Sequence, residues 1–62
     1  MIRYIKEDSQ YFYVVTERGQ TASMSKNHAR LVNSNSRTWT IERWGYAYTY
    51  DEKCNLIESH KY

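Results

Sequence analysis

The sequence predicts an α+β fold in which one helix packs on a small antiparallel sheet, in the order β-β-α-β-β. Residues 11–16, YFYVVT, are all aromatic or β-branched, which is typical of a central strand. A helix is indicated by residues at the spacing i, i+4, i+7 and i+8, namely Met24, His28, Leu31 and Val32. A chain of 62 residues has room for one domain, so we treat residues 1–62 as a single small domain.

The elements of the first half follow from these patterns. Residues 2–6 are strand formers, the polar residues 7–10 predict a turn, and residues 11–16 complete a first hairpin. Gly19 then supplies a turn residue that tolerates positive φ. The helix is expected over residues 21–33 and ends in a polar loop.

Residues 37–50 again favour strand structure. Strict alternation puts Trp39 and Ile41 on one side of the strand. It puts the other aromatic residues of this segment on the opposite side, namely Trp44, Tyr46, Tyr48 and Tyr50. A β-bulge near Arg43 would bring the two sets together, and a tight turn over residues 43–45 would instead create two strands. Either alternative predicts a bend or break at Gly45. Residues 51–55 predict a turn, and residues 56–60 a last strand.

The last hairpin carries a local motif. Residues 46–56, YAYTYDEKCNL, resemble the tyrosine-aspartate repeat of large bacterial Rhs-type shell proteins, whose pattern is roughly Y-x-Y-D-x-x-G-N-L. Cys54 stands where that pattern has glycine. The resemblance implies a β-hairpin with a left-handed residue at Cys54 or Asn55. A single copy implies no shell and no function, because such repeats need stacked neighbours.

The residues that could carry chemistry do not form a known motif. Cys54, His28 and His60 are the only cysteine and histidines, and their spacing matches neither a nucleophilic site nor a zinc site. With two glycines there is no phosphate-binding loop. The acidic pairs at residues 7–8 and 51–52 fall in predicted turns, where carboxylates make local hydrogen bonds. We therefore expect no enzyme, no catalytic residues, no metal, no cofactor and no small-molecule substrate.

The composition also indicates where the protein acts. No apolar run approaches the ~20 residues that span a bilayer, so we expect no membrane association. One cysteine cannot form an internal disulfide, which small secreted domains usually need, so we expect a cytoplasmic protein.

A basic block lies in the middle of the chain. Between Arg18 and Ile41 there are four cations and no acid, whereas the remaining residues carry a net charge of −2. On the predicted helix, this block suggests nucleic-acid binding as an alternative function. Its candidate contacts are Lys26, Asn27, Arg30 and Arg37.

The aromatic residues predict the main function. Ten aromatic residues, seven of them tyrosine, exceed what a core of this size can bury. Because tyrosine and tryptophan anchor protein interfaces, we expect a non-enzymatic binding protein, such as a phage or mobile-element inhibitor or adaptor. Its expected partner is another protein or a second copy of itself. The candidate contacts are Trp44, Tyr46, Tyr48, Tyr50, Tyr11 and Tyr13.

Overall fold

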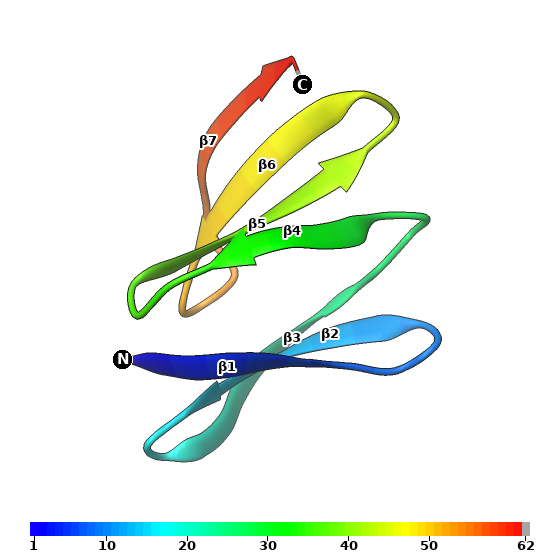
Figure 1. The fold of residues 1–62 in the computed structure, drawn as a ribbon. Coiled ribbons are helices and arrows are strands. Elements are labelled where there is room, and N and C mark those ends of the chain that lie inside the picture. The colour runs from blue at the N-terminus through cyan, green and yellow to red at the C-terminus, as the bar shows by residue number, and fades with distance from the viewer. Residues whose placement is uncertain (62) are drawn as a thin grey trace.

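The computed structural model describes residues 1–61, which form seven antiparallel strands in two sheets and contain no helix (Figure 1). The first sheet has the order β1-β2-β3, and the second has the order β4-β5-β6-β7. Each strand therefore pairs with its neighbours in the sequence. The strands are β1 (Ile2–Glu7), β2 (Tyr11–Thr16), β3 (Gly19–Ser25), β4 (Arg30–Ser34), β5 (Thr38–Arg43), β6 (Tyr46–Asp51) and β7 (Leu56–Lys61).

The predicted helix over residues 21–33 is wrong, and the α+β fold class is wrong with it. Two strands, β3 and β4, occupy this segment, and the connection between them holds Asn27 and His28 at positive φ values of 45° and 69°. The segment is rich in serine, threonine and asparagine, which favour a helix only weakly. Strand pairing makes this segment extended, because β3 forms backbone hydrogen bonds with one edge of β2, and β4 forms them with one edge of β5.

The other predicted strands are confirmed. Strands lie at Ile2–Glu7, Tyr11–Thr16 and Leu56–Lys61, and residues 37–50 break as expected near Gly45. The alternative with two strands is the correct one. Trp44 and Gly45 form a tight turn with φ values of 52° and 81°, which suits a two-residue hairpin turn.

Polar side chains hold three of the hairpin turns. Asp8, Asn35 and Asp51 each stand at the start of a turn and accept two backbone N–H bonds from residues two to four positions ahead, at 2.7–2.9 Å. These bonds lower the pKa of Asp51, with the Asn55 N–H contributing most. Asp8 and Asp51 therefore make the local bonds that the sequence predicted, whereas Glu7 lies in β1 and Glu52 pairs with the N-terminal amino group at 2.9 Å.

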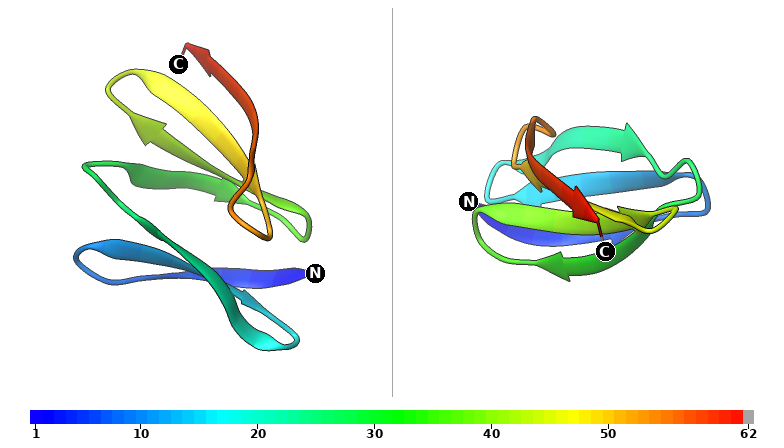
Figure 2. Two further views of the ribbon diagram at one scale, coloured as in Figure 1. Left: turned by 180° about the vertical axis from the view of Figure 1, so that it is seen from behind. Right: turned by 90° about the horizontal axis from the view of Figure 1, so that it is seen from above.

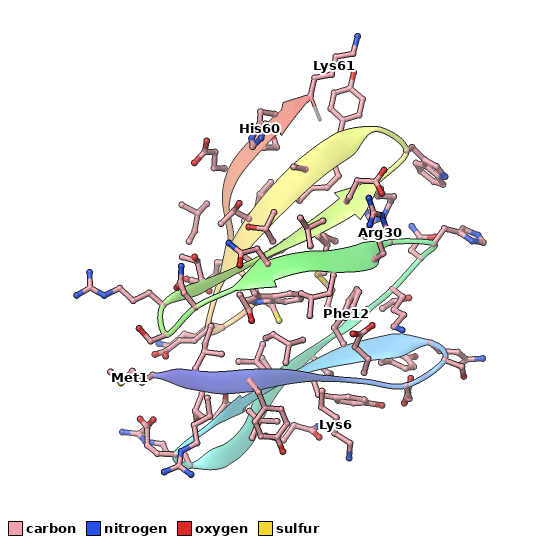
Figure 3. All side chains as sticks on the ribbon, viewed as in Figure 1. Met1, Lys6, Phe12, Arg30, His60 and Lys61 are labelled. Carbon is pink, nitrogen blue, oxygen red and sulfur yellow. The ribbon has the colours of Figure 1, made fainter. Side chains whose placement is uncertain are left out.

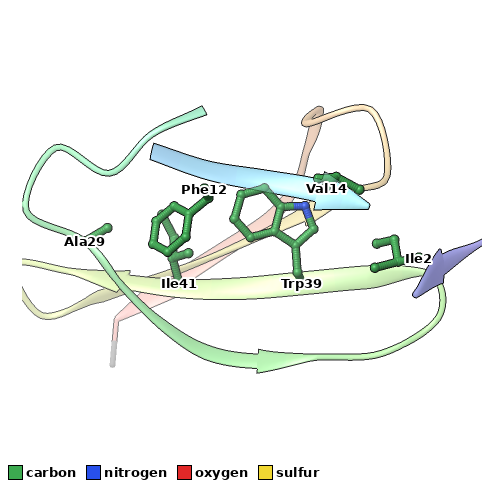
Figure 4. Packing of buried hydrophobic residues seen from close by; sticks show 6 residues of the cluster. All are labelled: Ile2, Phe12, Val14, Ala29, Trp39 and Ile41. Atoms are coloured by element: carbon green, nitrogen blue, oxygen red, sulfur yellow. The ribbon is translucent and has the colours of Figure 1, made fainter. Parts of the chain in front are cut away.

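The core lies between the two sheets, where β2 faces β5 (Figure 4). Phe12 and Val14 from β2 and Trp39 and Ile41 from β5 are fully buried. The rings of Phe12 and Trp39 meet edge to face with 5.5 Å between their centroids. One backbone bond ties the sheets directly, since the Ile2 N–H donates to the Ser36 carbonyl at 2.8 Å.

The second sheet extends beyond the first. In Figures 1 and 2, β4 and β5 lie beside the first sheet, while β7 lies farthest from it. All six residues of β7 are exposed. The far part of the second sheet therefore has an inner face that the first sheet does not cover.

Candidate functional site: a tyrosine shelf on the second sheet

The aromatic residues of β6 lie on the same face as the core. Tyr50, Tyr48 and Tyr46 stand directly opposite Trp39, Ile41 and Arg43 of β5. Residues directly opposite in an antiparallel pair project to the same side. Strict alternation along a single strand would have put them on opposite sides, but the segment forms two strands, and their pairing brings the two sets to one face. The two-residue turn at Trp44 and Gly45 sets this register.

Exposure rises along this face from Tyr50 to Tyr46. Tyr50 packs on Trp39 with 5.3 Å between ring centroids, and burial raises the pKa of its hydroxyl. Tyr48 is half-buried beneath the Arg43 guanidinium, which lies 5.6 Å from the ring centroid. Tyr46 is 47% exposed. Tyr50 and Tyr48 thus pack against the core as partly buried residues, and Tyr46 lies at the surface.

The neighbouring strand adds a second cation to this face. Lys61 of β7 stands opposite Tyr46, so it projects to the same side, and its side chain is exposed. Lys61 lies at the upper end of β7 in Figure 3. We call this surface the tyrosine shelf and define it by Arg43, Tyr46, Tyr48 and Lys61.

The acidic side chains of these strands lie on the outer face of the sheet. Glu42, His60 and Glu58 alternate with the shelf residues on β5 and β7, so they project to the other side of the sheet. Arg30 Nε donates to Glu42 Oε1 at 2.8 Å, and this bond lowers the pKa of Glu42. The shelf therefore carries cations and tyrosines, and the back of the sheet carries the acids.

Trp44 lies in the turn between β5 and β6, at the tip of the hairpin that carries the shelf. Its side chain is 72% exposed. The ring lies 6.4 Å from the His28 ring, between centroids. The turn that presents it is held by the Gly45 N–H, which donates to Glu42 Oε2 at 3.1 Å. Trp44 is thus a large exposed aromatic residue on a turn that is fixed from behind.

The other two predicted contact residues lie elsewhere. Phe12 and Val14 of β2 point into the core, so Tyr11 and Tyr13 point to the outer face of the first sheet. The Tyr13 hydroxyl donates to Asp8 Oδ2 at 2.7 Å, which raises the pKa of Tyr13 and lowers that of Asp8. The structure therefore separates the six predicted aromatic contacts into two groups on two sheets.

The predicted basic surface is not assembled. Lys26 Nζ pairs with Glu7 Oε1 at 3.0 Å and lies 5.3 Å from the Phe12 ring centroid, and Arg30 pairs with Glu42. Asn27 sits in the connection between the sheets, and Arg37 in the turn before β5. Because residues 1–61 contain no helix, the helical spacing that was expected to align these four residues does not apply. The alternative of a nucleic-acid-binding helix has lost its structural basis.

The surroundings of Cys54 do not favour a reactive thiolate. Cys54 has φ of 64°, as the motif resemblance implied, and packs against the core. Burial, and then the charge of Asp51, raise the pKa of its thiol, which is the reverse of what activates a nucleophilic cysteine. Within residues 1–61 no three His, Cys, Asp or Glu side chains gather as a metal site would require.

Sequence reasoning missed the two cations of the shelf. Arg43 lies two residues after Ile41 and four after Trp39, so the sequence alone predicts that it shares their side of the strand. Lys61 joins it only through the pairing of β6 with β7, which a sequence pattern does not specify. The described residues also contain no helix long and apolar enough to cross a membrane.

No protein-family model, curated protein or solved structure significantly matches this chain. The expectation of a phage or mobile-element inhibitor thus gains no support from relatives.

Proposed function

We propose that the protein is a non-enzymatic binding module that holds a protein partner on the tyrosine shelf and Trp44. The observation that carries the proposal is the position of the shelf. The shelf lies on the same face of the second sheet as the core, beyond the region that the first sheet covers. The row of aromatic residues on this face therefore runs from the core out to solvent.

The residue types support a protein partner. Tyrosine, tryptophan and arginine are the residues most enriched among interface anchors. Tyrosine and tryptophan bury a large area with few rotatable bonds, and arginine adds a planar group with several hydrogen-bond donors. Arg43 is already held over Tyr48 by a cation–π contact, so little freedom is lost when a partner orders it.

The charges indicate the chemistry of the partner. The shelf carries Arg43 and Lys61, and the carboxylates of Glu42 and Glu58 point away from it. A partner surface with apolar groups and carboxylates would complement this face. We extend the proposal to the cytoplasm, because the single cysteine is free and a reducing compartment would keep it so.

The experiment is affinity capture from nuclease-treated lysate with wild-type protein, Tyr46→Ala and Arg43→Glu. Tyr46→Ala should weaken capture by ~1–3 kcal/mol, because it removes an exposed anchor. Its melting temperature should stay close to that of the wild type. Tyr11→Ala is the matched control, because it removes an exposed tyrosine from the other sheet. Capture that is unchanged by both shelf variants, or lost equally in Tyr11→Ala, would refute the proposal.

A further inference from the structure

We propose that β7 pairs antiparallel with β7 of a second copy, about a two-fold axis that runs between the two strands, midway between the two copies of Ser59. The inference goes beyond the proposed function, since it concerns the edge of the second sheet and not the shelf. Strand β7 is the last strand of that sheet and is exposed along its whole length. A strand edge of this kind presents backbone N–H and C=O groups that can pair with another chain.

The shape of β7 sets the length of the pairing. The register between β6 and β7 shifts at Ile57, which is the extra residue of a bulge. Residues 58–61 beyond it continue as regular strand. Leu56 and Ile57 are each 55% exposed, so the edge also carries apolar area that a second copy can cover.

Symmetry restricts the register. When two antiparallel strands are related by a two-fold axis, the axis is perpendicular to the sheet and the inner faces of both copies lie on the same side. Residues directly opposite each other must then share a face, so the axis must lie midway between two copies of the same residue. An axis at Glu58 would place two carboxylates opposite each other, and an axis at His60 would place two imidazoles opposite each other. An axis at Ser59 instead places Glu58 opposite His60 of the second copy, twice.

The side chains are already arranged for that exchange. Glu58 and His60 lie on the same outer face, and Glu58 Oε2 lies 3.8 Å from His60 Nδ1 within one chain. The Ser59 register converts this contact into two contacts between chains, which is the self-complementarity that a two-fold interface needs. On the inner face, the same register places the aliphatic part of Lys61 beside the exposed Ile57.

The pairing would join two four-stranded sheets into one of eight strands. Since the axis is perpendicular to the sheet, the two tyrosine shelves would lie on the same side and meet at the axis. The short pairing predicts a weak dimer, with a dissociation constant of roughly 0.1–1 mM.

The first test is cross-linking in a Cys54→Ser background. With the axis at Ser59, the two Ser59 Cα atoms lie about 4.5–5.5 Å apart, within reach of a disulfide. Ser59→Cys should therefore give a covalent dimer under mild oxidation. Lys61→Cys is the matched control on the same strand. Its symmetry mates lie four residues out of register, about 13 Å apart, so it should stay monomeric.

The second test is sedimentation equilibrium of the full chain. Glu58→Lys should weaken the dimer by about threefold to tenfold, and the double variant Glu58→Lys with His60→Glu should restore it. A wild-type protein that stays monomeric at about 1 mM would overturn the proposal. Equal cross-linking of Ser59→Cys and Lys61→Cys, or an unchanged affinity in Glu58→Lys, would do the same.

Discussion

Replacing Trp39 with phenylalanine tests the packing of the two sheets. Trp39 is fully buried, and its indole N–H donates to the Asp51 carbonyl at 3.0 Å. That carbonyl also accepts the Cys54 N–H at 3.1 Å, so the variant leaves no unpaired acceptor. The lost bond should therefore cost only about 1 kcal/mol.

The smaller ring adds a packing cost. Trp39 meets Phe12 on one side and Tyr50 on the other, with ring centroids 5.5 Å and 5.3 Å away, so phenylalanine leaves a void between them. We expect about 1–2 kcal/mol for that void, and about 2–3 kcal/mol in total. A domain of this size has roughly 3–9 kcal/mol of stability, so the melting temperature should fall by roughly 10–20 °C.

The assay is urea and thermal unfolding followed by far-ultraviolet circular dichroism. Trp44→Phe is the matched control, because it makes the same chemical change at a side chain that is 72% exposed. Its stability should stay within about 0.5 kcal/mol of the wild type. Equal stability of the two variants would refute the placement of Trp39 at the centre of the core.

Two further predictions concern the turns. Gly45→Ala should destabilise the protein by about 1–2 kcal/mol in urea unfolding, because φ is 81° there although an added Cβ would meet no atom within 4 Å. An unchanged midpoint would show that the turn is not fixed in this conformation. Folding lowers the pKa values of Asp8, Glu42 and Asp51. These carboxylates therefore stabilise the fold at pH values above their unfolded pKa values, which are near 4. Their contribution is lost as the pH falls through the lower pKa values of the folded protein. Thermal melts between pH 7 and pH 2 should show this loss, and Asp51→Asn should show a smaller one; equal acid sensitivity of wild type and Asp51→Asn would argue against the Asp51 turn bonds.

The strands that could be predicted are those whose residues favour a strand and fit no helical pattern. Residues 11–16 contain only strand formers, and Asp8 and Asp51 indicate turns through bonds to the backbone nearby. These features depend on local chemistry, so the sequence alone predicts them. The same holds for the break at Gly45.

The segment of residues 21–33 shows where local patterns fail. Met24, His28 and Leu31 fit a helical face, yet Ala22 and Met24 also alternate as strand residues do, and both pack against the core. Local propensity was too weak to decide, and pairing with β2 and β5 decided it. The faces of the tyrosines depended likewise on a two-residue turn, since one residue more or less would reverse them.

The sequential order of the strands has a consequence for folding. Each sheet is one unbroken stretch of chain whose strands meet across short turns, so hairpins can form in ~1–10 μs without closing long loops. Because most strand pairs are close in the sequence, we expect a shorter folding time than that of sandwiches whose strands cross between sheets, which fold in roughly milliseconds to seconds. The remaining step joins the two halves through residues 26–29 and buries Trp39 against Phe12. In the Trp44→Phe variant Trp39 is the one tryptophan left, so a change in its fluorescence after a temperature jump would report the docking of the halves, after the hairpins have formed.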